Sequence, residues 1–495
     1  MIPNIRNPRA RSLSGSLKVA FLAVIVFAGL AAQAVGGDPP ARRIDLAGVW
    51  RCQLDPEDQG AAEQWYRLDA FEHTVHLPGS LTENGLGDEI TVDTPWTGSI
   101  VDRSWFTEPQ YAPYREPGQV KVPFWLTPLK YYKGAAWYTR LVRVPPGWKD
   151  QRVELFLERC HWQTRVWVDG QAVGSRDSLS CPHVYNLGAL EAGVHRITIC
   201  VDNRVKIGVG VNAHSVSDHT QGNWNGIVGR LELRARPRVW IEDVQVWPDL
   251  DRRAAVVRMH VGNATGGEIR GMVALEVRPH PNGPVLVRRE VPLQCPAKMN
   301  DIEADCILGD RVALWDEFSP NLYVLRAETR VGVDRDVVET TFGLRRFATQ
   351  GTQFTINGRK TILRGTLECC IFPKTGYPPT DKAEWRRILR IAKAHGLNHI
   401  RFHSWCPPEA AFAAADELGV YFQVECAAWA NSGSSIGDGR PIDTFIYAEG
   451  DRIIKMYGNH PSFCMLAYGN EPAGGNQQRW LGELVTYWKR KDPRR

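Results

Sequence analysis

The strongest constraint on the fold is a change in hydrophobic period near residue 350. Before it, apolar residues alternate with polar ones in short segments, as Val153, Leu155 and Leu157 do, and such alternation is typical of half-buried β-strands. After it, short apolar runs alternate with segments whose apolar residues recur at helical spacing. The chain therefore combines all-β modules with a later region of strand–helix units.

Two β modules precede the change in period. From about residue 44 to 236 the expected strands are separated by turn signals, and Asp169 followed by Gly170 favours a tight hairpin. The next ~110 residues, with about seven strands, fit an immunoglobulin-like module. We predict a jelly-roll-like β-sandwich over residues 35–236 and an immunoglobulin-like β-sandwich over residues 237–347, each burying a core of its own.

Four strand–helix units follow residue 350. Their repetition indicates parallel βα units. The strands are expected at 362–367, 398–402, 421–425 and 463–468, and the helices after a cap at Thr380, at 407–418, around 446–457 and at 477–491. A complete (β/α)₈ barrel needs about 250 residues. We therefore predict that residues 348–495 form the N-terminal half of a TIM barrel and that the chain is incomplete.

The N-terminus has the three parts of a secretory signal peptide. Basic residues without an acid precede an apolar run, and a small-x-small cleavage signal follows it. The basic residues are Arg6, Arg9, Arg11 and Lys18, the apolar run spans 19–30, and the cleavage signal spans 32–34. We predict a signal peptide over residues 1–34 and a secreted or periplasmic protein. A retained membrane anchor is the alternative, although the run is short for a membrane span.

Charge and cysteine usage exclude several classes of partner. The formal net charge is +5, and four of these charges precede the apolar run, so the remainder is near neutral. This argues against nucleic acid or an anionic membrane as a partner. The eleven cysteines are scattered; Cys295 and Cys306 are placed to close a loop, but most are expected to be buried apolar residues. No metal site or cofactor is predicted, and a homo-oligomer is compatible with the sequence.

Polar residues cluster where the four strands of the last region end. In a barrel of parallel strands the active site lies at the carboxyl ends of the strands. The residues at these ends are Glu368, Arg401, His403, Glu425, Asn470 and Glu471. Carboxylates flanked by a basic residue and an amide suit glycoside hydrolysis. There, one carboxylic acid protonates the leaving oxygen and a second carboxylate, about 5–5.5 Å away, attacks the anomeric carbon.

Several motifs together carry a resemblance to a known family. Residues 459–472, which end in Gly-Asn-Glu-Pro, resemble the acid/base signature of glycoside hydrolase family 2. Matching blocks lie at 398–403 and 415–421; segments 134–138, 166–170 and 224–229 resemble the family's sugar-binding domain, and 314–320 with 342–345 resemble the close of its immunoglobulin-like domain. The resemblance covers nearly all of residues 44–495, in the family's domain order.

The resemblance implies a retaining β-glycosidase, with a β-galactosidase-like activity as the leading expectation. It makes Glu471 the acid/base and Asn470 the ligand of the hydroxyl beside the scissile bond. Arg401 would orient the carboxylates, and His403 would contact sugar hydroxyls. Five further residues are candidate substrate contacts: Glu368 and Glu425 at the strand ends, and Asp218, Trp224 and Asn225 in the first module.

The sequence also departs from the family pattern. His403 stands two residues after Arg401, where many members have it three after, and residues 366–370 lack the usual Asn and His. The Glu-x-His that serves magnesium in large β-galactosidases is absent after Glu425. The family's nucleophile is a Glu on a later strand, which this chain does not contain. The chain alone is therefore expected to be an inactive fragment.

Each assignment has a structural alternative. Glu471 in its Asn-Glu-Pro context can serve as a helix cap, and Arg401 can form an ion pair that stabilises the barrel. His403 can be a hydrogen-bonded loop residue, and Glu425 can be a structural partner of Arg401. A folding role is the alternative for the three residues of the first module. For the whole chain, the alternative is a secreted glycan-binding protein without catalysis.

Overall fold

The computed structural model describes residues 42–68, 70–310 and 312–495. The predicted signal peptide over residues 1–34 lies outside the described residues. Within the described ranges, no helix combines the length and the apolar character needed to cross a membrane.

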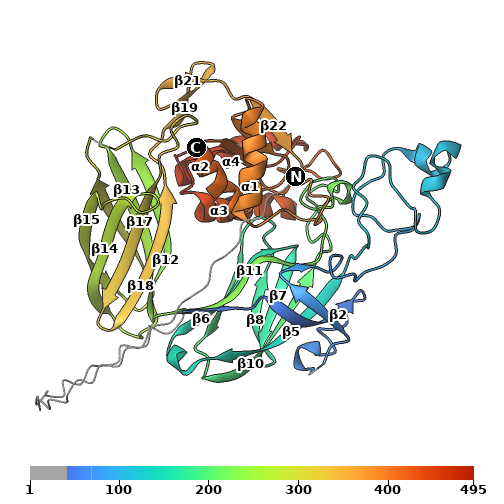
Figure 1. The fold of residues 1–495 in the computed structure, drawn as a ribbon, viewed down its shortest axis with the longest axis horizontal. Helices are drawn as coiled ribbons and strands as arrows, with labels where there is room; N and C mark the ends of the chain where they lie inside the picture. Colours follow the sequence, from blue (N-terminus) through green and yellow to red (C-terminus); the bar gives the residue numbers. More distant parts are fainter. Residues whose placement is uncertain (1–41, 69, 311) are drawn as a thin grey trace, which may run out of the picture. The chain divides into compact units, whose positions relative to one another are not determined.

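The first module is a sandwich of two antiparallel sheets (Figure 1). One sheet has the order β1-β11-β6-β9, with β4 also paired to β11, and the other has the order β3-β2-β5-β10-β7-β8. The strands are β1 Arg43–Asp45, β2 Gly48–Asp55, β3 His73–Leu77, β4 Gly79–Ser80, β5 Ala135–Val144, β6 Arg152–Cys160, β7 Gln163–Val168, β8 Gln171–Arg176, β9 His183–Gly188, β10 Gly193–Asp202 and β11 Gly226–Arg236. Their inward apolar residues form one buried core between the sheets, as alternation in the sequence predicted.

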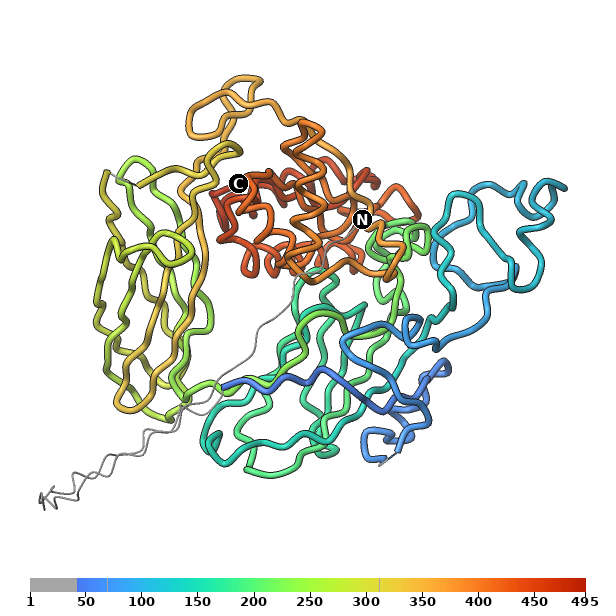
Figure 2. The backbone as a smooth tube through the Cα atoms, in the orientation of Figure 1, coloured from blue at the N-terminus to red at the C-terminus, as the bar shows by residue number. Residues whose placement is uncertain are grey.

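The connection from β4 to β5 is long and carries two of the module's five 3₁₀-helices. It leaves the sandwich as an extended excursion of the backbone (Figure 2) and has a small core of its own around Trp105, Val120 and Val122. The 3₁₀-helices are η1 Trp65–Arg67, η2 Arg103–Phe106, η3 Pro109–Tyr114, η4 Pro146–Trp148 and η5 Asp218–Thr220.

The second module is a smaller sandwich of a three-stranded sheet, β12-β13-β16, and a four-stranded sheet, β15-β14-β17-β18. Its strands are β12 Val239–Asp249, β13 Ala254–Asn263, β14 Ile269–Pro279, β15 Val287–Cys295, β16 Met299–Ile307, β17 Tyr323–Val331 and β18 Asp334–Phe342. They enclose a separate core. Cys295 and Cys306 are both free and buried, as are most of the other cysteines, so no disulfide joins them. The prediction of β-sandwich architecture is confirmed for both modules.

A small antiparallel sheet that the sequence did not predict separates the second sandwich from the βα units. It consists of β19 Phe347–Gln350, β20 Gln353–Ile356 and β21 Arg359–Thr361. Asn357 lies at the turn between β20 and β21 in the left-handed region, with φ of 52°, a conformation that Asn tolerates better than most residues.

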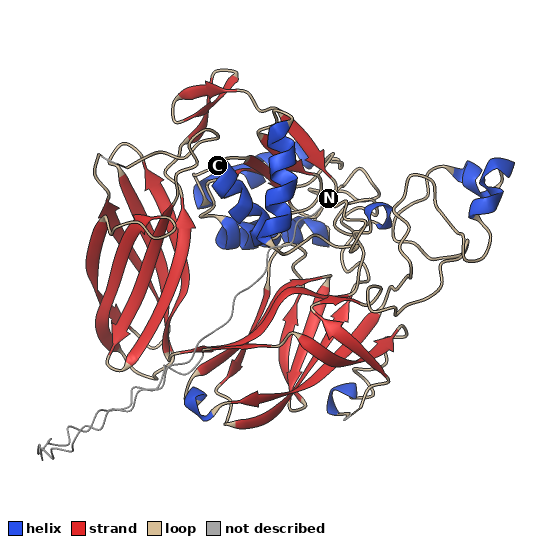
Figure 3. Ribbon diagram, viewed as in Figure 1, coloured by secondary structure: helices blue, strands red, loops and turns tan. Residues whose placement is uncertain are grey.

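The last region is a parallel sheet in the order β22-β23-β24-β25, and four helices alternate with its strands in the chain. Figure 3 shows helices of this region gathered near the C-terminus. The elements are β22 Gly365–Glu368, α1 Lys382–Ala394, β23 His399–Phe402, α2 Glu409–Leu418, β24 Tyr421–Glu425, α3 Pro441–Tyr457, β25 Phe463–Ala467 and α4 Gln477–Lys491. Four strands alternating with four helices were predicted, and this alternation is confirmed. The described residues form an open sheet, so half a barrel stays a prediction.

Local chemistry explains where these helices begin and end. The cap of α1 is Asp381 rather than the predicted Thr380, because the Asp381 carboxylate accepts the backbone N–H of Glu384 at 2.8 Å. Helix α3 begins with Pro441, whose missing N–H costs nothing at a first helical position. Helix α2 ends at Gly419, whose φ of 68° suits glycine.

The core of the βα region is shared with the first sandwich. It includes side chains from β23, β24, α1, α2, α3 and α4, but also Trp162, Val209 and Val216 from the first module. Trp162 is fully buried, and its ring lies 5.7 Å from that of Phe445 in α3. The βα units therefore depend on the first module for part of their packing. This shared core was not predicted, because each sandwich was expected to bury a core of its own.

Candidate functional site

The polar residues predicted at the strand ends lie along one edge of the parallel sheet. Register pairs Glu368 with Phe402, and Glu425 with Ala467, so the carboxyl ends of neighbouring strands are level. Asn470 and Glu471 follow β25 directly, and Asn470 forms an isolated bridge with Trp429 in the loop after β24. Strand order thus brings together residues that are separated by up to about a hundred positions in the chain.

Arg401 links three of the strand ends through hydrogen bonds. Its Nε donates to Glu425 Oε1 at 2.7 Å, and its Nη2 donates to Asn470 Oδ1 at 2.8 Å. The second oxygen of Glu425 accepts the backbone N–H of Ser404 at 2.7 Å, and Glu425 is fully buried. Burial raises the pKa of Glu425, while the Arg401 guanidinium opposes that rise. Both oxygens of Glu425 are therefore engaged within the protein.

Asn470 has one end of its amide fixed and the other end unused. Its Oδ1 accepts from Arg401, while its Nδ2 has no hydrogen-bond partner among the described residues. The residue is only 5% exposed. Leaving a buried donor without a hydrogen bond costs free energy. An incoming hydroxyl oxygen would satisfy it.

Glu471 is exposed and sits in a strained backbone conformation, with φ of 38°. Its Oε2 accepts from Trp429 Nε1 at 2.8 Å and from Asn431 Nδ2 at 3.4 Å. These two donors, with smaller effects from His403 and Arg401, lower the pKa of Glu471. The carboxylate is therefore ionised at neutral pH in this structure. To act as a general acid it must gain a proton when a second carboxylate or a substrate changes its surroundings.

Glu368 has the opposite electrostatic character. It is half-buried, and its two oxygens accept the backbone N–H groups of Cys370 at 2.9 Å and Ile371 at 3.0 Å. Burial raises the pKa of Glu368 to about 7, against the lowering effect of those amide donors. This carboxyl group titrates near neutral pH at the edge of the site.

His403 is buried among aromatic rings. Its ring centroid lies 4.8 Å from that of Trp429 and 4.8 Å from that of His214, which comes from the first module. Burial, with a smaller effect from Arg401, lowers the pKa of His403, and burial lowers the pKa of His214 to about 3. Both imidazoles are neutral at pH 7 and are suited to hydrogen bonding rather than to charge.

The three predicted residues of the first module hold loops together. Asp218 Oδ2 accepts the backbone N–H groups of Gly98, at 3.0 Å, and Thr97, and burial raises the pKa of Asp218 to about 6. Asn225 accepts from the Tyr138 hydroxyl and donates to two carbonyls. The Trp224 ring lies 5.7 Å from that of Tyr377. The contacts of these three residues are with other residues than Glu471 in the described part of the chain. Their substrate role stays a prediction.

A cavity of about 370 Å³ adjoins Glu471. It includes residues that the sequence did not single out, because they become neighbours only in the folded chain. From the first module these are Ser99, Val211 and Asn212, and from the loop after β24 they are Trp429, Asn431, Ser432 and Gly433. An aromatic residue and an amide just after a barrel strand were the only signal that could have pointed to Trp429 and Asn431.

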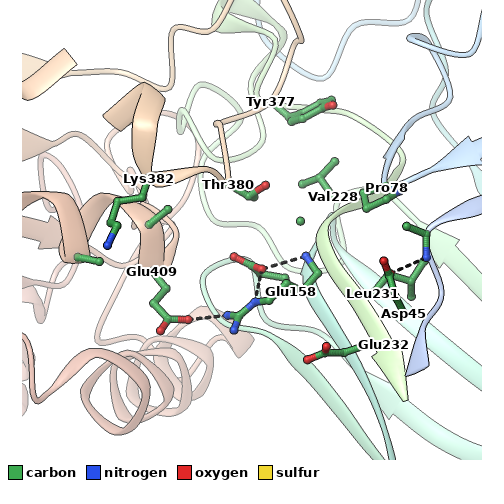
Figure 4. Close-up of a pocket in the computed structure, with 15 residues that line it drawn as sticks. Asp45, Pro78, Glu158, Val228, Leu231, Glu232, Tyr377, Thr380, Lys382 and Glu409 are labelled. Atoms are coloured by element: carbon green, nitrogen blue, oxygen red, sulfur yellow. Dashed lines mark hydrogen bonds and ion pairs between the residues drawn. The ribbon is translucent and has the colours of Figure 1, made fainter. Parts of the chain in front are cut away.

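A larger cavity, of about 730 Å³, is lined by a set of residues that does not include Glu471. Figure 4 shows the residues around it. It opens where the first sandwich faces α1 and α2. Glu158 accepts from Arg230 Nε at 2.7 Å, and Arg230 Nη2 donates to Glu409 at 2.6 Å. These charged groups are paired with one another across the two regions, so they support the interface rather than a reaction.

Within the described ranges, no group of three His, Cys, Asp or Glu side chains is arranged to hold a metal ion.

Curated proteins named as β-galactosidases match most of this chain. The β-galactosidase large subunit of Latilactobacillus sakei is 23% identical over 380 residues, covering 74% of this chain and 58% of that protein. The β-galactosidase of Priestia megaterium is 24% identical over 428 residues, covering 82% of this chain and 40% of that protein. The chain thus spans about half the length of these curated relatives.

Solved structures share the fold. A β-glucuronidase of an uncultured Clostridium sp. matches with a TM-score of 0.68 at 20% identity, over 92% of this chain and 71% of that one. A β-galacturonidase from Eisenbergiella tayi bound to galacturonate matches with a TM-score of 0.66 at 18% identity, over 91% and 70% of the two chains.

Family models assign both sandwiches. Residues 44–237 match the sugar binding domain of glycosyl hydrolases family 2, and residues 239–345 match the adjoining domain of glycosyl hydrolases family 2. Together the two matches cover more than half of the chain. With its strand-end cluster and its two sandwiches in the family's order, this chain belongs to glycosyl hydrolase family 2.

Proposed function

We propose that this chain carries the acid/base part of a retaining β-glycosidase active site, with Glu471 as the acid/base. The observation that carries the proposal is the pairing of two groups at the end of β25. The Glu471 carboxylate is exposed, and the adjacent Asn470 has a buried amide nitrogen without a partner. A carboxyl group beside an unsatisfied donor suits a sugar whose glycosidic oxygen and neighbouring hydroxyl must be contacted together.

Arg401 supports this arrangement as a positioning residue. By donating to Asn470 Oδ1, it fixes which end of the amide is a donor. Because Glu425 holds the same guanidinium, the Asn470 amide is oriented by an arginine that is fixed to a buried carboxylate. We propose this as the reason why Arg401 and Glu425 occupy neighbouring strand ends.

Hydrolysis with retention needs a second carboxylate about 5–5.5 Å from the first. Glu425 is buried with both oxygens engaged, and Glu368 accepts from two backbone amides. Neither group is free to attack an anomeric carbon. We therefore propose that these 495 residues alone do not turn over glycosides, and that the four βα units belong to a (β/α)₈ barrel whose nucleophile they do not supply.

The substrate class is a terminal β-linked sugar, with a β-galactoside as the leading proposal. Matched relatives include β-galactosidases and a Paenibacillus borealis protein named β-glucuronidase, 21% identical over 481 residues. A neutral sugar and a uronic acid differ by one carboxylate, so matched nitrophenyl β-galactoside and β-glucuronide substrates separate the two proposals.

The test is an assay of the 495-residue chain against nitrophenyl β-glycosides. We expect no turnover above the Glu471→Ala background. Turnover that Glu471→Ala abolishes would contradict the proposed lack of a nucleophile while supporting the acid/base. Turnover that Glu471→Ala leaves intact would contradict the acid/base. Saturable binding of β-linked oligosaccharides that Glu471→Ala leaves unchanged would favour a glycan-binding protein without catalysis.

A further inference from the structure

A loop of the first sandwich runs alongside the loop that follows β24. The Trp429 backbone N–H donates to the Val209 carbonyl at 2.7 Å, and the Val211 N–H donates to the Ser432 carbonyl at 2.9 Å. The Asn212 N–H then donates to Ser432 Oγ at 3.2 Å. We call this set of bonds between residues 207–212 and 429–434 the inter-module seam. It joins two segments that are more than two hundred residues apart in sequence.

Gly210 sits at the closest approach within the inter-module seam. Its φ is +101°, and a Cβ placed there would lie 2.0 Å from the Trp429 carbonyl oxygen. Any side chain at this position would therefore push the Trp429 backbone away. Gly208, two residues earlier in the same loop, is different, because a Cβ there would meet only the Ser434 hydroxyl at 3.9 Å.

The side chain of Trp429 reaches from the inter-module seam to Glu471. Its indole Nε1 donates to Glu471 Oε2 at 2.8 Å. The ring is fixed on its other sides by His403, at 4.8 Å, and His214, at 5.9 Å between ring centroids. The indole therefore has little freedom to leave the carboxylate.

We propose that Trp429 is the positioning residue of the Glu471 carboxylate, and that the first sandwich holds Trp429 in place through the inter-module seam. The proposal rests on the acid/base role proposed for Glu471, and it adds a function for the sugar-binding module. The loop of that module sets the position of the hydrogen-bond donor that orients the acid/base.

The proposal has a consequence for protonation. Trp429 and Asn431 act on Glu471 by donating hydrogen bonds, and His403 and Arg401 have smaller electrostatic effects on it. A donor bonded to the ionised carboxylate favours that form. Removing the indole N–H, or shifting it away, will raise the pKa of Glu471 while leaving the other three groups in place.

The experiment titrates Glu471 in the full chain by ¹³C NMR, using glutamate labelled at the side-chain carboxyl carbon. The Glu471→Gln variant identifies the signal by its loss. We expect Trp429→Phe, which keeps the ring and the backbone of the seam, to shift the Glu471 titration to higher pH. Gly210→Ala is expected to shift it in the same direction, and the matched control Gly208→Ala is expected to leave it unchanged.

An unchanged Glu471 titration in Trp429→Phe would overturn the positioning role. A folded Gly210→Ala protein with the wild-type titration would overturn the role of the first sandwich. If Gly210→Ala does not fold, Val211→Pro removes one donor of the seam and is judged by the same criterion. Because the titration needs no turnover, these outcomes are independent of the glycoside assay, in which the acid/base proposal itself is tested.

Discussion

The first sandwich and the βα region bury their apolar residues in different ways. The sandwich core is built from its own strands and includes Trp50, which is 1% exposed. The βα core borrows side chains from the sandwich, including Trp162. At the edge of the parallel sheet, β22 exposes Leu367 at 49%, and among the described residues β22 pairs only with β23. The sandwich thus has a core of its own strands, while the core of the βα region is completed by side chains of the sandwich.

The largest effect on stability is expected from removing Trp162, the tryptophan of the first sandwich that packs in the core of the βα region. Trp162→Ala deletes a fully buried side chain at the junction, and large-to-small core changes of this kind cost about 3–5 kcal/mol. We expect hydrogen exchange to speed up in α3, which contains Phe445, and not only in the sandwich. Trp50→Ala is the matched control and should loosen the sandwich first. Equal protection of α3 in the two variants would contradict the shared core.

An intermediate effect is expected from removing a buried carboxylate of the βα region that is hydrogen-bonded to the first sandwich. Glu449 in α3 is fully buried and accepts from Ser178 Oγ at 2.9 Å and from the Leu179 N–H at 3.0 Å. Glu449→Ala removes the acceptor of both groups, and leaving the Leu179 N–H without a partner costs about 1–3 kcal/mol. Urea unfolding with separate probes for the two regions measures this. Destabilisation confined to α3, with the 178–179 loop unaffected, would show that these hydrogen bonds do not stabilise the sandwich.

A smaller, pH-dependent effect is expected at Glu368. Burial raises the folded-state pKa of this group from 4.5 to about 7. A raised folded pKa means that the contribution of Glu368 to stability is complete below about pH 4.5 and is lost as the pH rises to about 7. Glu368→Gln should therefore flatten the fall in unfolding free energy over this window. An identical pH profile for the variant and the wild type would show that burial does not perturb Glu368.

The sequence predicts the site better where it depends on neighbouring strands than where it depends on distant loops. Arg401, Glu425 and Asn470 were identified because each lies at or just beyond the carboxyl end of a strand, and parallel pairing then brought them into contact. Trp429 and His214 were missed as site residues, because their positions depend on the inter-module seam and on ring packing between modules. No local pattern encodes a contact between residues 211 and 432.

Other differences between the predicted and the observed structure also have local physical causes. Asp218 and Asn225 have polar side chains of the kind that bind sugars, but their hydrogen bonds are used within the protein. The extra sheet before β22 was missed because its three strands have at most four residues each, too short for a reliable alternation signal. The strand–helix order after residue 362 was predicted because its helices are long enough to show their period.

The most direct test of the central claim is the leaving-group dependence of hydrolysis in Glu471→Ala. It is measured with dinitrophenyl and methyl β-glycosides in a form of the protein that hydrolyses aryl β-glycosides. General acid catalysis contributes roughly 10²–10⁴-fold, and a dinitrophenolate needs little protonation. We therefore predict that Glu471→Ala loses about that factor on the methyl glycoside and much less on the dinitrophenyl glycoside in the glycosylation step. Equal losses on the two substrates would contradict Glu471 as the general acid.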